Sequence, residues 1–425
     1  MEMLNNIRSV GFWAFDVLRG GIIKNDYLEI QRSLNNTSIL SSTTEQLKYL
    51  LDYSIANVPY YSNYQPAIEA FPVVDKSIIK NDWNRFISKK NNIKNLKLVT
   101  TSGSTGTPFS IYVDRRKRIR NYADTIYFSE LAGYRLENLL LYLKIWVSSR
   151  MAPSIVYKIE NICPIDVLRF SEKEINFLLK IMERKKCSIL AYASVLDILS
   201  IYLKKNDLYL KNGKLKSIIA ISESLSEETK RNLSERTGVC VVSRYSNLEC
   251  GIIAQQQTDF SSKYLINRAS YYIEILKMDC DLPVEIGELG RIVVTDLYNF
   301  AQPMIRYDTG DVGAFEDYER QFFSIIEGRK LDLLYNTKGC LISSYLVYKN
   351  MWQYNEIDQY QLIQEGKTDY NIVITAKNGF LREKQLKLEF ISYLGADANI
   401  RIEYVDHIPL LASGKRKKIV NNWIK

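Results

Sequence analysis

The stretch SEKEINFLLKIMERKKCSILAYASVLDILSIYL (Ser171–Leu203) alternates between helical and strand-like patterns, and it decides the fold class. It opens with a capping box formed by Ser171 and Glu174, and apolar residues at helical spacing follow, so a helix is predicted as far as about Lys186. The next predicted elements are a strand over 188–193 and a second helix over 195–203. A strand enclosed by two helices is typical of an α/β protein.

The same alternation continues on the C-terminal side of this stretch. We predict a strand over 217–221, a helix from Ser226 to Gly238 and a strand over 239–243. Strands separated by helices of this length indicate parallel strand pairs, whose ligands usually bind beyond the carboxyl ends of the strands. The polar motifs described below are predicted to follow such strands.

A smaller α+β unit is expected at the C-terminus. The predicted elements are strands over 359–364, 370–376 and 399–405 and a helix over 381–394. The segment 328–339 before them has no long apolar run, which favours a boundary or hinge. We therefore expect a large N-terminal α/β domain, residues 1–328, and a small mobile C-terminal α+β lid domain, residues 329–425.

Composition excludes several classes of protein. The chain has 425 residues, of which 46% are hydrophobic and 25% charged, as in ordinary globular proteins and unlike disordered or collagen-like ones. The six cysteines form no CxxC pair, and His407 is the one histidine, so a zinc site is not expected. A cytoplasmic protein with reduced cysteines is predicted. Although the net charge is +9, no basic segment is interleaved with aromatics, so nucleic-acid binding is not expected.

The apolar stretch Val10–Ile23 leaves two interpretations open. It is too short to span a bilayer, and Asp16 and Arg19 interrupt it, so it does not have the pattern of a secretory signal. It is either a helix packed on the body of the protein or a helix that lies at a membrane interface, in which case the protein would be membrane-associated.

A polar loop carries the first indication of chemistry. TTSGSTGTP (Thr100–Pro108) follows a short apolar lead and combines hydroxyl side chains with glycines. Glycines let backbone N–H groups approach phosphate oxygens, and hydroxyls add uncharged donors, so polyphosphate binding is predicted. No Gly-Lys-Ser/Thr ends the loop, so it is not a Walker loop. The predicted phosphate-contacting residues are Thr101, Ser102, Gly103, Ser104, Thr105, Gly106 and Thr107.

This loop resembles the phosphate loop of the adenylate-forming superfamily, which includes acyl-CoA synthetases, and four further motifs follow in the order that the superfamily uses. They are Tyr245-Ser246-Asn247-Leu248-Glu249, Tyr307-Asp308-Thr309-Gly310-Asp311, Gly328-Arg329 and Ser413-Gly414-Lys415. Within the superfamily, Val58-Pro59-Tyr60-Tyr61 and the turn with Glu223 and Ser224 resemble phenylacetate-CoA ligase and the CapK-like capsular-polysaccharide branch.

The resemblance implies a role for each motif. Tyr245, with Ser246, Asn247, Glu223 and Ser224, would form the adenine side, and Asp311 would bind the ribose. Glu249 would hold Mg²⁺, and Arg329 would contact the nucleotide. Lys415 would bridge the substrate carboxylate and the α-phosphate. ATP and Mg²⁺ are the implied cofactors, with CoA as one acceptor.

The implied reaction is adenylation of a small-molecule carboxylate to an acyl-adenylate and pyrophosphate, followed by acyl transfer to CoA or to another thiol or amine. Two alternatives stay open, namely AMP or acyl transfer to a hydroxyl or amine of a sugar or cofactor, and a nucleotide-binding scaffold that has lost catalysis. Leu248 stands where the superfamily has a threonine that contacts phosphate, and Ser246 where it has a glycine. The acid and the oligomeric state are not determined by these motifs.

Overall fold

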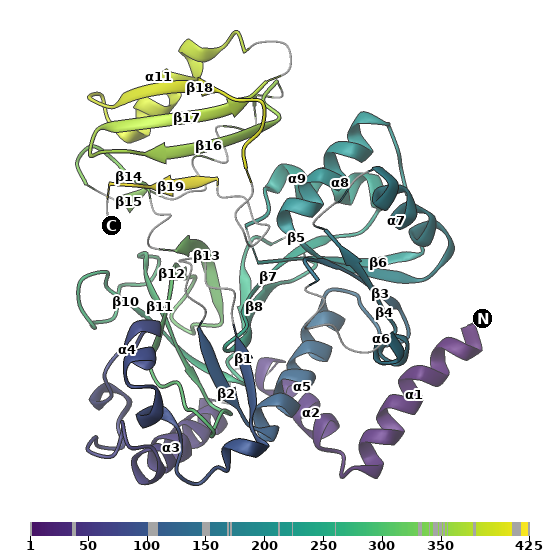
Figure 1. Cartoon of the computed structure of the whole chain (residues 1–425), viewed down its shortest axis with the longest axis vertical. Helices are drawn as coiled ribbons and strands as arrows, with labels where there is room; N and C mark the ends of the chain where they lie inside the picture. Colours follow the sequence, from purple (N-terminus) through teal and green to yellow (C-terminus); the bar gives the residue numbers. More distant parts are fainter. Residues whose placement is uncertain are drawn as a thin grey trace. The chain divides into compact units, whose positions relative to one another are not determined.

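A computed structural model of the chain describes residues 2–35, 40–100, 109–146, 154–167, 170, 172–210, 213–222, 224–259, 261–329, 334–339, 341–342, 347, 351, 353–354, 356–376, 380–409 and 418–423 (Figure 1). It does not describe the side chains of 2–7, 40–42, 154, 328–329 and 341. The chain divides into two compact units, residues 1–222 with 230–326, and residues 223–229 with 327–425.

The larger unit is built on an 11-stranded sheet with the strand order β10-β11-β12-β13-β9-β8-β7-β6-β5-β3-β4. The strands are β3 (Leu139–Lys144), β4 (Ile162–Asp166), β5 (Cys187–Tyr192), β6 (Leu215–Ile221), β7 (Val241–Asn247), β8 (Gly251–Gln256), β9 (Tyr264–Ile266), β10 (Tyr271–Leu276), β11 (Gly290–Asp296), β12 (Tyr307–Phe315) and β13 (Phe322–Arg329). Strands β4, β3, β5, β6 and β7 are parallel neighbours, which confirms the predicted parallel pairs. The rest of the sheet begins where β8 pairs with β7 in the antiparallel sense, and this half was not predicted.

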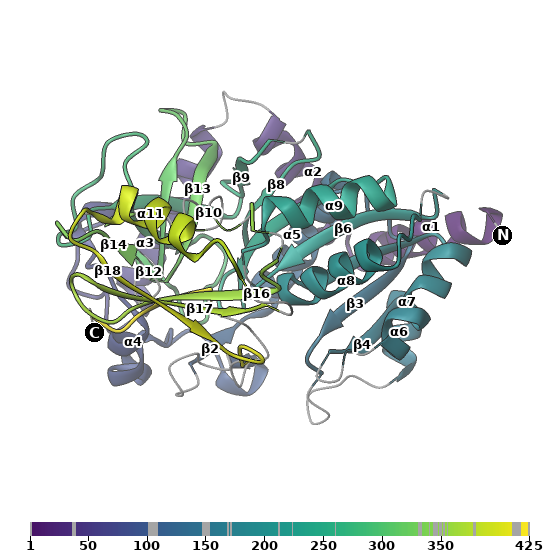
Figure 2. The same cartoon turned by 90° about the horizontal axis from the view of Figure 1, so that it is seen from above.

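Helices cover the parallel half of the sheet. They are α6 (Ser154–Glu160), α7 (Glu172–Arg184), α8 (Ala193–Lys205) and α9 (Glu227–Thr237). Helix α5 (Arg115–Leu131) instead contacts β8 of the antiparallel half. Figure 2 shows α8 alongside β6, and α8 contacts both β5 and β6. Helix α7 buries an apolar stripe at the spacing that the sequence predicts, formed by Ile175, Leu178, Leu179 and Met182.

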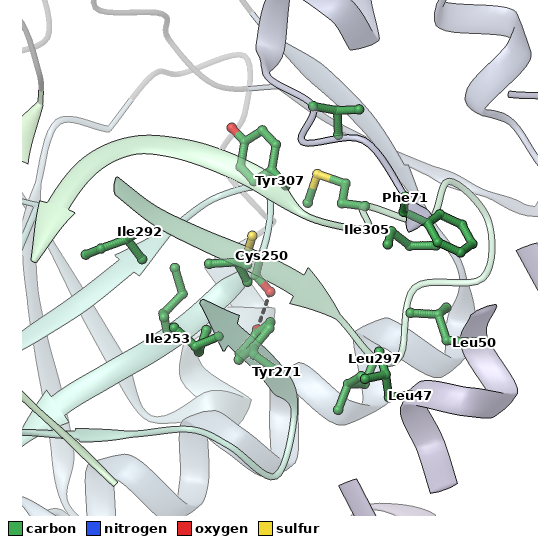
Figure 3. Packing of buried hydrophobic residues seen from close by; sticks show 14 of the residues in the cluster. Leu47, Leu50, Phe71, Cys250, Ile253, Tyr271, Ile292, Leu297, Ile305 and Tyr307 are labelled. Atoms are coloured by element: carbon green, nitrogen blue, oxygen red, sulfur yellow. Dashed lines mark hydrogen bonds between the residues drawn. The ribbon is translucent and has the colours of Figure 1, made fainter. Parts of the chain in front are cut away.

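The N-terminal region consists of helices, short 3₁₀ turns and a separate two-stranded sheet. These elements are α1 (Glu2–Leu18), α2 (Ile22–Asn35), α3 (Leu40–Asn57), α4 (Lys76–Asn81), the turns Ile68–Ala70, Trp83–Phe86 and Ile93–Asn95, and the strands β1 (Lys97–Thr100) and β2 (Ser110–Val113). The main core forms where α3 and the following segment pack on the antiparallel half of the sheet (Figure 3). Leu47, Leu50 and Phe71 belong there to the same buried cluster as the strand residues Ile253 and Ile292.

The smaller unit contains a four-stranded sheet of order β18-β17-β16-β19. Its described elements are β14 (Leu334–Tyr335), β15 (Leu341–Ile342), β16 (Gln359–Gln364), β17 (Asp369–Thr375), α11 (Glu383–Leu394), β18 (Asn399–Tyr404) and β19 (Ile419–Asn421). Leu386 and Phe390 of α11 pack into one core with Leu362 and Ile372 of the sheet. The unit is therefore an α+β fold with its own core, as expected.

One boundary differs from the prediction in a way that affects the motifs. The strand expected over 239–243 is β7, which begins at Val241 and continues to Asn247. Gly238 has φ +71, a left-handed conformation that ends α9 and delays the strand. The residues Tyr245, Ser246 and Asn247 therefore lie in a strand, and the motif beginning at Tyr307 opens β12, so neither motif simply follows a strand.

Candidate active site

The turn after β7 places Glu249 at the site. The backbone N–H of Cys250 donates a 2.7 Å hydrogen bond to Oδ1 of Asn247, which closes the turn. Gly251 has φ +111, and a Cβ there would lie 2.9 Å from Oδ1 of Asn121 and 3.0 Å from the hydroxyl of Tyr271. A glycine is needed at this position both for the backbone conformation and for the close packing. Glu249 is 3% exposed.

The start of β12 forms the other half of the site. The hydroxyl of Thr309 donates to the carbonyl of Ile292 on β11 at 2.9 Å, and it accepts from the N–H of Asp311 at 3.1 Å. Gly310 has φ +81, so the chain turns sharply between these two residues. Asp311 is thereby held next to Thr309.

The two motifs are joined by reciprocal hydrogen bonds. The hydroxyl of Tyr245 donates to Oδ2 of Asp311 at 2.8 Å, and the hydroxyl of Tyr307 donates to Oε1 of Glu249 at 2.8 Å. Each motif therefore supplies a phenol to the carboxylate of the other. Burial, reinforced by Asp311, raises the pKa of Tyr245 well above its usual value, and burial with Glu249 does the same for Tyr307. Both phenols stay protonated as donors at neutral pH.

Lys76 is a site residue that the sequence analysis missed. Its ammonium lies 2.7 Å from Oε1 of Glu249 and forms an ion pair with it. The backbone of Val74 donates to the carbonyl of Arg306 and accepts from the N–H of Asp308, so this segment runs beside the start of β12. The Asp75 carboxylate then caps α4. The cap is visible in the sequence, but no local pattern indicates that Lys76 meets Glu249.

The ends of the predicted phosphate loop are anchored beside these residues. Thr100 pairs with Ser110 across β1 and β2, and their hydroxyls are 2.9 Å apart. Phe109 is buried and stacks on the ring of Tyr307, with ring centroids 6.4 Å apart, while Nζ of Lys76 lies 5.6 Å from the Phe109 ring centre. The residues Thr101–Thr107, together with Glu223 and Lys415, lie outside the described residues.

The remaining predicted residues are placed as follows. Ser246 and Asn247 are partly buried at the end of β7, next to Tyr245, and Ser224 is exposed. Arg329 lies at the end of β13, and its side chain is not among those described. The structure therefore brings Tyr245, Asn247, Glu249 and Asp311 together.

A buried polar chain supports the turn that carries Glu249. The hydroxyl of Tyr271 donates to the carbonyl of Cys250 at 2.5 Å, a bond drawn in Figure 3. Lys117 of α5 in turn donates to the Tyr271 hydroxyl at 3.1 Å and pairs with Asp296 at 2.7 Å. Lys117, Tyr271 and Asp296 are fully buried. Tyr271 is therefore a core residue.

Cys250 itself is inert. Its side chain is buried in the main core, and burial, reinforced by Glu249, raises the thiol pKa well above its usual value. A protonated, inaccessible thiol is a poor nucleophile.

Glu249 is the carboxylate predicted to hold a metal. Within the part of the chain that the structure describes, no three His, Cys, Asp or Glu side chains gather into a metal-binding group. Mg²⁺ commonly binds through one or two carboxylates together with substrate phosphates, so the single carboxylate of Glu249 fits such a role in number, with its Oε1 already paired with Lys76.

Solved structures share this architecture. Crystal structures of 2-hydroxyisobutyryl-CoA ligase in the postadenylation state, with R3-HIB-AMP bound, match with a TM-score of 0.72 at 14% identity, over 89% of this chain and 88% of that chain. ATP-bound MatB from Rhodopseudomonas palustris matches with a TM-score of 0.60 at 16% identity, over 78% of this chain and 68% of that chain. The chain therefore has the fold of the adenylate-forming CoA ligases, with a large domain and a C-terminal domain.

The sequence comparisons are more specific. Residues 334–422 match the family model described as the CapK C-terminal domain. The chain is 21% identical to Protein CapK of Staphylococcus aureus over 430 residues, which is 94% of this chain and 93% of that protein. The resemblance to the adenylate-forming superfamily and its CapK-like branch is thus confirmed.

Proposed function

We propose that this protein binds ATP and Mg²⁺ and adenylates a small-molecule carboxylic acid. The main observation that supports this proposal is the pair of hydrogen bonds between the two motifs, from Tyr245 to Asp311 and from Tyr307 to Glu249. Residues predicted separately to bind adenine, ribose and metal come together as one nucleotide site would require. The 2-hydroxyisobutyryl-CoA ligase with an acyl-AMP bound and the ATP-bound MatB support the choice of substrate chemistry.

Each described residue has a proposed task. Tyr245 stacks on adenine and orients Asp311, which accepts hydrogen bonds from the ribose hydroxyls. Glu249 would hold Mg²⁺, whose charge would neutralise the phosphates during attack by the acid. Tyr307 and Lys76 both contact Oε1 of Glu249, so Oε2 is the oxygen we assign to metal binding.

The residues outside the described set complete the proposal. The loop Thr101–Thr107 would donate to the β- and γ-phosphates. Lys415 would bring a positive charge to the carboxylate and the α-phosphate, where negative charge develops in the transition state. Residues 329–425 are proposed to act as the lid domain that carries Lys415, with Arg329 at its start.

The acyl group is proposed to pass to CoA or to another thiol or amine, in a pathway of capsular polysaccharide synthesis. The fold of the CoA ligases favours CoA, because structures of 2-hydroxyisobutyryl-CoA ligase contain CoA together with 2-HIB-AMP. The similarity to Protein CapK favours the polysaccharide pathway. It also favours the second candidate, AMP or acyl transfer to a sugar hydroxyl or amine.

Pyrophosphate exchange into ATP, measured with Mg²⁺ and a panel of carboxylic acids, tests the proposal. Glu249→Gln and Asp311→Asn should each reduce exchange about 100-fold or more, since each removes a charge aimed at the reacting nucleotide. Glu319→Gln, in the exposed turn between β12 and β13, is the matched control and should leave exchange unchanged. Absence of exchange with every acid, while ATP still binds, would refute adenylation of a carboxylate.

Two further measurements separate the alternatives. The mass of the product distinguishes an acyl thioester from an adenylated or acylated sugar. Lys415→Ala should abolish adenylation by an enzyme, whereas a scaffold would keep its cellular role with this substitution.

A further inference from the structure

The outward side of α1 is apolar. Helix α1 packs on α2 through one face, where the Trp13 and Tyr27 rings meet at 5.7 Å. Figure 1 shows the purple helix extending to the N-terminus beyond this contact. From residue 10 to residue 18 the exposed positions carry no charged or polar side chain. They are Val10, Gly11, Ala14, Phe15, Val17 and Leu18, with Leu18 85% exposed and Phe15 54% exposed.

This arrangement is the reverse of that in an ordinary surface helix, which presents polar residues to water. The acidic residue of the helix between residues 8 and 18 is Asp16, and it is buried. Its carboxylate accepts hydrogen bonds from the backbone N–H groups of Ile23 and Lys24, at 3.2 and 2.8 Å, and so caps the start of α2. The one negative charge of residues 8–18 therefore does not lie on the apolar face.

Positive charges surround the same face. Arg8 precedes it, and its guanidinium donates to the carbonyl of Lys158 on α6. Arg19 follows it and stacks on Phe15, with 4.3 Å between the guanidinium carbon and the ring centre. Lys24 lies over Trp13 at 4.4 Å. Cations placed over aromatic rings at the edge of an apolar surface are typical of helices at the water–lipid boundary.

We propose that α1 docks this protein on an anionic lipid surface, with Phe15, Val17 and Leu18 inserted among the acyl chains and the three cations at the phosphate level. The 17 residues of α1 span about 25 Å, less than the roughly 30 Å of a bilayer's hydrocarbon core, so the helix lies in the interface and does not cross it. Among the helices that the structure describes, none is long and apolar enough to cross a membrane.

A second copy of the chain is the competing occupant of this face. In a two-fold dimer the same patch meets itself, and Arg8, Arg19 and Lys24 would approach their own counterparts. The exposed charges of segment 8–25 are all positive, so self-association brings like charges together, whereas anionic headgroups neutralise them.

Cosedimentation of the full chain with extruded vesicles tests the proposal. We expect binding to phosphatidylcholine vesicles that contain about a third phosphatidylglycerol, and at least about tenfold weaker binding to pure phosphatidylcholine. Phe15→Glu/Leu18→Glu should reduce binding to the anionic vesicles at least about tenfold. Arg8→Gln and Arg19→Gln should each weaken it about fivefold.

The matched control is Leu282→Glu/Tyr318→Glu. It makes the same charge change at two exposed apolar residues, in the connections β10–β11 and β12–β13 at the other end of the large sheet, and it should bind like the parent chain. Equal binding by the two double variants, or no binding by the parent, would overturn the proposal. A third result would also overturn it: the parent chain forms a dimer in analytical ultracentrifugation, Phe15→Glu/Leu18→Glu dissociates that dimer, and the parent chain does not bind vesicles.

A second measurement locates the contact. Vesicles with brominated acyl chains should quench part of the tryptophan fluorescence, and Trp13→Phe should remove that quenching. Quenching that persists in Trp13→Phe would place the contact elsewhere and refute docking through α1. Neither experiment requires ATP or an acid, so its outcome does not depend on the proposed adenylation.

Discussion

The ammonium of Lys76 forms a 2.7 Å ion pair with the buried carboxylate of Glu249, whose same oxygen accepts a hydrogen bond from Tyr307. Glu249 is 3% exposed, whereas Lys76 at the first turn of α4 is about one third exposed. The lysine therefore supplies the positive charge that a buried carboxylate needs, from a position that can still move toward solvent or toward a bound phosphate.

Lys76→Met should lower the free energy of unfolding by about 1–2 kcal/mol, because it leaves Glu249 buried without its cation. In the double variant with Glu249→Gln the loss should be smaller than the sum of the single losses. Urea unfolding of the four proteins of this cycle measures the coupling. Lys80→Met, at an exposed position of the same helix, should cost no more than a few tenths of a kcal/mol. Additive single effects would mean that the ion pair contributes nothing.

Tyr271→Phe should destabilise the protein by about 1–3 kcal/mol, since it removes the donor of the buried Cys250 carbonyl and an acceptor of buried Lys117. The turn that carries Glu249 loosens as a result, so pyrophosphate exchange should also fall. Thermal unfolding and exchange assays measure the two effects. Tyr272→Phe, the partly exposed neighbour on β10, is the control. The prediction fails if both variants unfold at the same temperature.

Gly251→Ala should be more damaging than Gly287→Ala. Both glycines have positive φ, +111 and +82, so alanine is strained at either position. Only at Gly251 would the new Cβ also press on Asn121 and Tyr271, while at Gly287 nothing lies within 4 Å. We expect a cost of about 1 kcal/mol at Gly287 and at least about 3 kcal/mol at Gly251. Denaturant midpoints compare the two, and equal costs would contradict the packing argument.

The stability of the protein should fall in alkali partly through Tyr134. Burial, reinforced by Glu137, raises the pKa of its phenol to about 12. An unfolded tyrosine ionises near about pH 10, so the contribution of Tyr134 is complete below that pH and is lost as the pH rises through its folded pKa. The loss is about 1.4 kcal/mol per pH unit in this window.

Urea unfolding at several pH values between about 10 and 12 measures this slope. Tyr134→Phe should make it shallower, whereas Tyr318→Phe, which removes an exposed phenol, should not change it. A slope in Tyr134→Phe as steep as in the parent chain would rule out this role for Tyr134.

Much of the fold follows from local sequence patterns. The capping box at Ser171 and the apolar spacing after it predict a helix that the structure places at Glu172–Arg184. The strands over 217–221 and 359–364 are likewise found, as β6 and β16. The antiparallel half of the large sheet was not predicted. Most of its neighbouring strands are consecutive in the chain, but β9 pairs with the distant strand β13, and no local pattern specifies that pairing.

The residues of the candidate site also fall into two groups, those that local motifs predict and those that they do not. Tyr245, Glu249 and Asp311 could be predicted because each belongs to a short motif with a fixed order of residue types. Lys76, Lys117 and Tyr271 could not, because each acts through a partner far away in the sequence and stands in no motif of its own.

The amino-acid sequence by itself determined the α/β class, the α+β character of the C-terminal unit, and which residues carry the nucleotide motifs, because these depend on neighbours within a few positions. Only the tertiary structure decided that the phenols of two motifs bond to each other's carboxylates and that Lys76 pairs with Glu249. It also decided that α1 turns an uncharged face outward while burying Asp16. The physical reason is that hydrogen bonds, ion pairs and exposure depend on distances in space, which chain folding sets and sequence spacing does not.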